Sequence, residues 1–301
     1  MKLPTNQADD SQTSAESQLR ADWTARQKTF GNVPQAVLLK NLPTSINDLI
    51  DTWHRVVLQW SLSPLSNNPS ALIADLGCGY GRMTTTVKAM GFENIIGLDY
   101  EAGFCRQYQL DHGMAVRGTI AHPPFVDSSL AGAYAITAFM YVGANGATEG
   151  LSELDASLLP GARVLLMEAG AEFNNAVRKI LPGKRSQSLA VTGFTRSEMQ
   201  DLLLPRGWNT VASGNNFWTT MLLPLLLASR RWSRLFNALS GLAMHLDRPR
   251  PGLRDRRAKQ LSLHRWILCE KPVSDPPIRH PSAVISTVAI CNQETPNKRP
   301  G

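Results

Sequence analysis

The apolar positions along the chain alternate between helical spacing and short continuous runs. Residues 45–60 carry apolar side chains at helical spacing, and Ser45 and Asp48 form an S-x-x-D capping pattern at their start. From residue 72 onward, short apolar runs alternate with more polar segments, several of which end at glycine. Continuous apolar strands between helices that stop at glycine are typical of a parallel sheet buried on both faces.

This pattern predicts alternating strands and helices. The expected strands are residues 72–76, 94–99, 115–117, 134–139, 163–168, 209–212 and 264–270. The expected helices that follow the first one are residues 82–90, 101–112, 148–159 and 196–204. Thr195 and Glu198 form a second capping box at the start of the last of these helices. We therefore expect an α/β fold with a doubly wound sheet.

Composition divides the chain into a main domain and flanking segments. Residues 1–20 are polar, and residues 272–301 are aperiodic and rich in proline, so we expect both to be disordered tails. Residues 21–70 are expected to form an N-terminal helical cover. The main domain is expected over residues 71–271, with an insertion at 213–263 before the last strand.

The net charge of +7 is concentrated in one segment of the chain. Residues 230–265 contain ten Lys or Arg and two Asp, which gives +8 there and −1 for the rest. The four cysteines lack disulfide or metal-ligand spacing, so we expect a reducing compartment and no metal. No signal-peptide pattern and no run of about 18–20 apolar residues is visible, which predicts a cytoplasmic protein.

The stretch IADLGCGYGR carries the clearest chemical signal. Gly77, Gly79 and Gly81 alternate directly after a predicted strand, and Asp75 precedes them. The spacing differs from the G-x-G-x-x-G fingerprint of dinucleotide-binding loops, because position 82 is Arg. Glycines let the backbone approach a ligand closely, since they have no Cβ. The alternative is a tight strand-to-helix turn that binds no ligand.

A second carboxylate lies at the end of the next predicted strand. Asp99 follows Gly79 by 20 residues, close to the offset at which ribose-binding carboxylates occur in doubly wound folds. We expect Asp99 to accept ribose hydroxyls and Tyr100 to pack against a base. Asp99 can alternatively cap the helix that begins near Glu101. Its spacing from the glycine loop favours the ligand interpretation.

The pattern D-x-G-x-G-x-G resembles the first motif of class I S-adenosylmethionine-dependent methyltransferases. The resemblance covers residues 71–168, and a weaker resemblance extends to the stretch LHRWILCEKP. It implies a mostly parallel seven-stranded sheet with an antiparallel last strand, and S-adenosyl-L-methionine as the cofactor. The cofactor-binding residues that it implies are Asp75, Gly77, Cys78, Gly79, Tyr80, Gly81, Asp99, Tyr100, Thr119, Ile120, Ala138 and Phe139. Thr119 stands where the family often has an acidic residue.

Methyl transfer, which the resemblance implies, is an in-line displacement that needs alignment and exclusion of water more than acid–base chemistry. Tyr141 and Glu168 lie near the ends of predicted strands and, with His122, are the candidate catalytic residues. The alternatives are packing for Tyr141 and capping for Glu168. His112 and His264 are interpreted as a helix-end residue and a packed histidine.

The expected acceptor is a small molecule or a lipid- or saccharide-type molecule. The insertion joins apolar runs to Arg clusters, so residues 217–260 either touch a membrane surface or form a lid with a solvated basic face. We favour the lid. The alternatives for function are an RNA methyltransferase that uses residues 230–265 and a non-catalytic S-adenosylmethionine-binding protein. The sequence has few aromatic residues in the basic segment, which argues against nucleic acid, and it does not indicate the oligomeric state.

Overall fold

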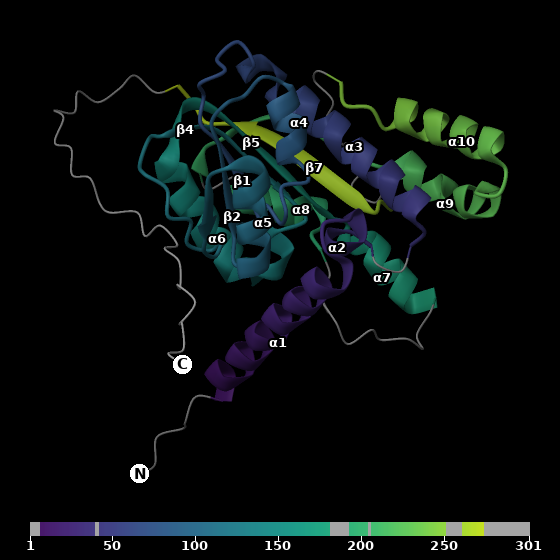
Figure 1. Ribbon diagram of the computed structural model, residues 1–301, viewed down its shortest axis with the longest axis horizontal. Helices are drawn as coiled ribbons and strands as arrows, with labels where there is room; N and C mark the ends of the chain where they lie inside the picture. Colours follow the sequence, from purple (N-terminus) through teal and green to yellow (C-terminus); the bar gives the residue numbers. More distant parts are fainter. Residues whose placement is uncertain (1–6, 40–41, 181–192, 204–205, 251–260, 274–301) are drawn as a thin grey trace, which may run out of the picture.

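The computed structural model describes residues 7–39, 42–180, 193–203, 206–250 and 261–273. Within these ranges seven strands form one sheet that helices cover on both faces (Figure 1). The strands are β1 (Ile73–Leu76), β2 (Ile95–Asp99), β3 (Ala115–Arg117), β4 (Leu130–Ile136), β5 (Leu158–Ala169), β6 (Asn209–Asn215) and β7 (His264–Glu270).

The strand order is β3-β2-β1-β4-β5-β7-β6, and β7 runs antiparallel to both β5 and β6. This confirms the predicted doubly wound sheet with an antiparallel last strand. Strand β1 pairs in parallel with β2 and β4, with Asp75 opposite Gly97 on one side and Tyr134 on the other. Parallel pairing brings the carboxyl ends of β1, β2 and β4 to one edge, where ligands bind in such sheets.

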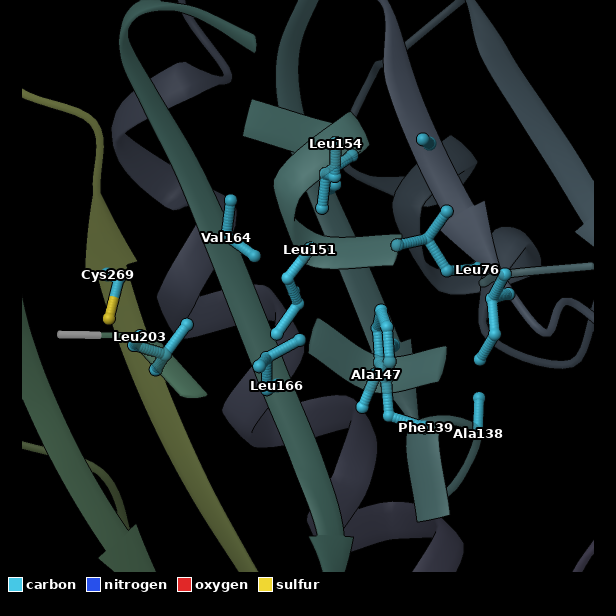
Figure 2. Close-up of a cluster of buried hydrophobic side chains, with 14 of the residues drawn as sticks. Leu76, Ala138, Phe139, Ala147, Leu151, Leu154, Val164, Leu166, Leu203 and Cys269 are labelled. Carbon is cyan, nitrogen blue, oxygen red and sulfur yellow. The ribbon is translucent and has the colours of Figure 1, made fainter. Parts of the chain in front are cut away.

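Most of the helices around the sheet follow the predicted alternation, but α7 (Ala171–Ile180) was not predicted. The other helices are α3 (Thr44–Leu62), α4 (Thr84–Ala89), α5 (Ala102–His112), α6 (Gly143–Ser157) and α8 (Arg196–Leu203), with the 3-10 turns η1 (Ser63–Leu65) and η2 (Phe139–Tyr141). One face of the sheet packs against α6 and α8, through a core that Figure 2 shows around Leu151, Leu166 and Leu203. The other face packs against α3 and α4, with Trp53 fully buried.

The predicted strand at 134–139 is misplaced. Strand β4 begins at Leu130 and ends at Ile136, and Thr137 then turns the chain with a φ of 56°. Residues 137–139 therefore lie in a turn at the edge of the sheet. The apolar character of Ala138 and Phe139 reflects burial in that turn and not strand structure.

The predicted disordered tail over residues 1–20 is wrong for residues 7–20, which are helical. Helix α1 spans Gln7–Phe30 and is followed by the short helix α2 (Pro34–Val37). Trp23 is buried in a cluster with Phe104, to which Leu19 and Phe30 add at helical spacing. Three large apolar residues on one helix face are enough to dock α1, although the segment is polar in composition. The predicted C-terminal tail lies outside the described residues from residue 274 onward.

The insertion forms a helical hairpin of α9 (Phe217–Ser229) and α10 (Ser233–Leu246), which lie side by side next to α3 (Figure 1). The insertion begins later than predicted, because β6 continues to Asn215. Leu226 and Ala243 are buried in the hairpin, and Asp247 accepts the backbone N–H groups of Trp218 and Thr219 at the start of α9. None of the helices described is long and apolar enough to cross a bilayer.

Candidate functional site

A cavity of about 830 Å³ lies at the carboxyl ends of β1, β2 and β4. Its floor includes the glycine loop and Asp99, and residues 118–122 line one side of it. Residues of α1 and the segment from Thr137 to the start of α6 complete its walls. The parallel strands thus place three loops, far apart in sequence, around one space.

The glycine loop adopts the conformation that its composition permits. Gly77, Gly79 and Gly81 all have positive φ angles, of 71°, 54° and 86°. A Cβ on Gly77 would lie 2.5 Å from the Ala138 Cβ, and one on Gly79 would lie 3.3 Å from a Val37 methyl carbon. The loop is therefore packed between the turn after β4 and helix α2. A side chain at either glycine would push against the side chains of Ala138 or Val37, beside the cavity that Gly77 and Gly79 line.

Asp99 joins the glycine loop to the end of β2. Its Oδ2 accepts the Gly79 N–H at 2.9 Å, and its Oδ1 accepts the Glu101 N–H at 2.9 Å. The cap of α5 is Glu101, which accepts the Phe104 N–H, so Asp99 is not the helix cap. Each carboxylate oxygen can accept a further hydrogen bond. Burial raises the pKa of Asp99 to about 6, although the backbone donors stabilise the charged form.

Asp75 lines the same cavity at the end of β1. Its Oδ2 accepts hydroxyl hydrogen bonds from Thr84 at 2.7 Å and from Tyr134 at 2.9 Å. Both bonds end on one oxygen and leave Oδ1 for a ligand. Burial raises the pKa of Asp75 to about 6. The two carboxylates therefore lie at adjacent strand ends, as the sequence predicted. Each can still accept a further hydrogen bond from a ligand.

Most of the remaining predicted cofactor residues also line the cavity. These are Cys78, Tyr100, Thr119, Ile120 and Ala138. Tyr80, Gly81 and Phe139 are not among the described residues that line it, so their contact with the cofactor stays a prediction. The Gly81 position packs against His112, Tyr80 packs beside the cluster around Trp23, and Phe139 is buried in the main core (Figure 2).

Glu168 supports the turn after β4 and is not among the residues that line the cavity. Its carboxylate accepts the backbone N–H groups of Ala138 at 3.2 Å, Phe139 at 2.9 Å and Met140 at 3.4 Å. Burial raises its pKa to about 8. These contacts fit the capping alternative for Glu168, which holds the loop that carries Ala138 and Tyr141 into the wall. A catalytic role for Glu168 stays a prediction.

The other ionisable candidates have different environments. Tyr141 lines the cavity and packs edge-on against Trp23, with ring centroids 5.2 Å apart. Burial raises the pKa of Tyr141, so its hydroxyl keeps its proton near neutral pH and can donate a hydrogen bond. His122 is exposed at the rim, and its hydrogen bond to Glu153 raises the pKa of the imidazole. His264 is buried, and burial lowers its pKa to about 3, which fits its interpretation as a packed histidine.

His112 is the last residue of α5, as the sequence predicted. Its ring packs on Tyr108, with centroids 5.0 Å apart, and the side chain lies under Gly81. Burial lowers the pKa of His112. A neutral imidazole in this packed position has a structural role.

The sequence did not predict the part of the wall that precedes β1, which consists of Gln18, Leu19, Asp22, Trp23 and Val37. The unpredicted cavity residues after β1 include Arg82, Met83, Phe104, Thr137, Asn145 and Glu149. The spacing of Leu19 and Trp23 was a usable signal, since residues four apart share a helix face. Arg82 directly follows the glycine motif and forms an ion pair with Asp51 of α3. No composition rule indicates that a polar N-terminal segment folds over a sheet edge.

Residues 74–166 match the family model described as a methyltransferase domain. These residues form a class I S-adenosylmethionine-dependent methyltransferase domain. The match spans β1 to β5, which are the strands that carry the glycine loop, both carboxylates and the turn after β4. A comparison with curated proteins finds no match.

The fold of the methyltransferase is shared with solved structures of low identity. A geranyl diphosphate methyltransferase, in complex with geranyl diphosphate and sinefungin, is 15% identical with a TM-score of 0.55, covering 86% of this chain and 99% of that chain. The geranyl diphosphate C-methyltransferase of Streptomyces coelicolor, solved with S-adenosyl-L-homocysteine, is 13% identical with a TM-score of 0.51, covering 86% and 98%. A methyltransferase of Leishmania major is 10% identical with a TM-score of 0.53, covering 85% and 83%.

The residues of the cavity fit S-adenosylmethionine, the cofactor of this domain. Among the described residues that line it, four carboxylates (Asp22, Asp75, Asp99 and Glu149) stand against one guanidinium, that of Arg82. An acidic lining suits a ligand with an ammonium and a sulfonium and disfavours a pyrophosphate. When bound, S-adenosylmethionine supplies a methyl group on a positively charged sulfur. The described residues contain no cluster of three or more His, Cys, Asp or Glu that could hold a metal ion.

Proposed function

We propose that this methyltransferase transfers a methyl group from S-adenosylmethionine to a small, largely apolar molecule that is neutral or cationic. The observation that supports this proposal is the cavity itself, which extends from the glycine loop to a wall made by α1. Cavities for one small ligand begin at about 300 Å³, so about 830 Å³ leaves room for a second molecule beside the cofactor.

The apolar part of the cavity lining supports an apolar acceptor. It includes Leu19 and Trp23 of α1, Val37 of α2, Met83 and Tyr141. Aromatic and aliphatic side chains give most of the contact area in sites of this kind. A polar group on the acceptor can use the Tyr141 hydroxyl, which stays protonated near neutral pH.

The charges of the lining oppose an anionic acceptor. Arg82 already pairs with Asp51, and the carboxylates of Asp22 and Glu149 also belong to the cavity lining. A diphosphate would meet carboxylates here without a matching set of cations. We therefore propose an acceptor that differs in charge from the geranyl diphosphate bound by two of the structural neighbours.

In this proposal the chain's contribution to the reaction is alignment and exclusion of water. The glycine loop and the two carboxylates fix one reactant, and the turn held by Glu168 fixes the wall beside it. Helix α1 screens the space from solvent. Holding two reactants in line and dry supplies most of what a displacement at a methyl carbon needs.

An RNA acceptor is the second candidate function, and the location of the basic residues argues against it. Arg230, Arg231 and Arg234 lie on the α9–α10 hairpin and are not among the residues that line the cavity. The cavity is lined by α1 and carries Asp22 and Glu149, which would repel a phosphate backbone. Salt-dependent RNA binding with methyl transfer to RNA would reverse this conclusion.

The experiment has two steps, so that cofactor binding and transfer are separated. Calorimetry with S-adenosylmethionine and S-adenosylhomocysteine should give dissociation constants well below about 1 mM. Transfer of a labelled methyl group is then measured with matched apolar amines, alcohols, phosphorylated alcohols and total RNA. We expect the labelled methyl group to be transferred to the amines or the alcohols. Preferred labelling of the phosphorylated compounds would contradict the proposed acceptor, and binding without transfer to any class would favour a non-catalytic protein.

A further inference from the structure

The α9–α10 hairpin exposes an unusual number of large apolar side chains. Along α9, Trp218, Met221 and Leu225 follow one another at helical spacing on the solvent side. Along α10, the exposed apolar side chains at helical spacing are Leu235, Leu242 and Leu246. Trp232, in the connection between the helices, is 64% exposed. Isolated apolar residues on a surface are ordinary, whereas a continuous apolar patch indicates an interaction site.

The inner side of the hairpin is already used for packing. Leu226 is fully buried in a cluster with Ile46 and Ile50 of α3, and Leu222, Leu227, Phe236 and Leu239 are partly buried against it. The hairpin is therefore firmly attached to the body next to α3 (Figure 1). The exposed apolar residues belong to its other side, so packing against the body explains only one of the two apolar sides.

Basic side chains surround the exposed apolar tip. Arg230, Arg231 and Arg234 are exposed on both sides of Trp232. Arg248 and Arg250 are exposed at the other end of the hairpin, just after α10. Within residues 217–250, all of which the structure describes, the acidic residue is Asp247, and it is buried under the start of α9. The exposed surface of this segment is thus positive as well as apolar.

We propose that the α9–α10 hairpin binds the surface of an anionic lipid bilayer. Trp232, Leu225 and Leu235 at the tip enter the boundary between headgroups and acyl chains, and the neighbouring arginines contact the anionic headgroups. Tryptophan, leucine and arginine in this arrangement are typical of interfacial segments. The helices lie at the interface and do not cross it, which agrees with their length.

The charge pattern favours a lipid surface over a second copy of the chain. A symmetric contact between two hairpins would bring several arginines face to face, because residues 217–250 expose no acidic side chain to pair with them. An anionic bilayer instead offers negative charge beside apolar depth. The proposal is also independent of the acceptor, because it rests on residues outside the cavity.

The test is flotation of the full chain with vesicles of phosphatidylcholine alone or mixed with phosphatidylglycerol. We expect the chain to float with the anionic vesicles and to lose binding as salt increases. Trp232→Ser with Leu235→Ser should weaken binding at least about tenfold, and so should Arg230→Gln with Arg231→Gln and Arg234→Gln. The matched controls are Leu110→Ser, at a leucine of α5 that is 76% exposed, and Arg106→Gln on the same helix.

Each alternative gives a different result. Binding that is equal for neutral and anionic vesicles, absent for both, or equally reduced by the α5 controls would overturn the proposal. A dimer in light scattering that Trp232→Ser dissociates would replace the lipid surface by a second copy of the chain. Affinity for S-adenosylhomocysteine, measured by calorimetry, shows that the hairpin variants are folded, since none of these residues lines the cavity.

Discussion

Asp99 is the residue on which the site depends most, because it connects backbone and cavity. It holds the N–H groups of Gly79 and Glu101 and still lines the space that the cofactor needs. A carboxylate with two backbone donors is fixed in position before any ligand binds. This preorganisation is the physical basis of the role that the spacing to Gly79 predicted.

We expect Asp99→Asn to weaken binding of S-adenosylhomocysteine by about 1–3 kcal/mol, the usual range for a hydrogen bond to a charged acceptor. The amide keeps the size of the side chain but loses the charge and turns one acceptor into a donor. Calorimetry measures the change, and Asp111→Asn on the exposed side of α5 is the control. Unchanged affinity in Asp99→Asn would show that this carboxylate does not contact the cofactor.

The glycine loop allows a comparison between two glycines with similar backbone angles. Gly77 and Gly91 have φ angles of 71° and 96°, but only Gly77 has an atom, the Ala138 Cβ, within 4 Å of an added Cβ. We expect Gly77→Ala to lower the free energy of unfolding by about 1–3 kcal/mol more than Gly91→Ala, because it adds a clash to the same strain. Urea unfolding measures both variants. Equal losses would mean that the loop moves freely away from Ala138.

Glu168 predicts a pH dependence of stability. Burial raises its pKa from 4.5 to about 8, so the folded chain binds this proton more tightly than the unfolded chain. The contribution of this raised pKa to the free energy of unfolding is complete below pH 4.5 and is lost as the pH rises to about 8.

In Glu168→Gln no proton can be lost, so between pH 6 and 8 the free energy of unfolding should decline less steeply, by up to about 1.4 kcal/mol per pH unit. The window starts at pH 6 because Asp75 and Asp99 titrate near there. Urea unfolding at several pH values gives the slopes, and Glu93→Gln at an exposed position is the control. Parallel slopes for the wild type and Glu168→Gln would contradict the raised pKa.

At the scale of elements, α1 is the least expected part of the site. It brings Leu19, Asp22 and Trp23 to the cavity, and few large side chains attach it. Elements with few buried contacts open at lower free energy than the main core. Helix α1 is therefore the element that we expect to admit and release ligands.

Trp23→Ala should detach α1 without unfolding the sheet. Truncating a buried Trp costs about 3–5 kcal/mol, which exceeds what a helix with a few apolar contacts can retain. Hydrogen exchange should accelerate in α1 and α2 and stay slow in β1, β4 and β5. Lys28→Ala, on the exposed side of α1, should leave hydrogen exchange unchanged in the helices and in the strands. Uniform acceleration throughout the domain would show that α1 belongs to the same cooperative unit.

The elements that the sequence predicted best are those with a strict pattern. Helix α3 at Thr44–Leu62 agrees with the expected helix at 45–60, because its buried positions repeat at helical spacing. The start of β4 was missed because Leu130–Ala133 mixes small residues with glycine, which gives little strand signal. The hairpin helices were seen only as an insertion, since α9 is apolar on almost every side and shows no helical stripe.

At the scale of the whole molecule, the cofactor should act as a stabilising ligand for the sheet edge and its loops. A ligand present at 100 times its dissociation constant adds about 2.7 kcal/mol to the folded state. We expect S-adenosylmethionine and S-adenosylhomocysteine to raise the melting temperature, and NAD to leave it unchanged because the lining is acidic. Asp99→Asn should reduce the shift. A larger shift with NAD than with S-adenosylhomocysteine would contradict the charge argument.

The domain boundaries at residues 20, 70 and 271 stay predictions. The structure changes only the expectation for residues 7–20, which are helical. The structure shows that the N-terminal helices and the sheet share one cavity. The hairpin adds a second surface next to α3, on which the proposed lipid contact depends. A methyltransferase that binds a membrane surface fits both proposals.

The sequence by itself determined the sheet, the glycine loop and the pair Asp75 and Asp99, because these depend on local patterns. Buried strands must be apolar, positive φ angles favour glycine, and a fixed offset along the chain brings the two carboxylates to adjacent strand ends. Only the tertiary structure decided which side chains face the cavity. Trp23 enters the wall, Glu168 turns to the backbone of residues 138–140, and the hairpin leaves one side exposed, because those outcomes depend on packing between segments distant in sequence.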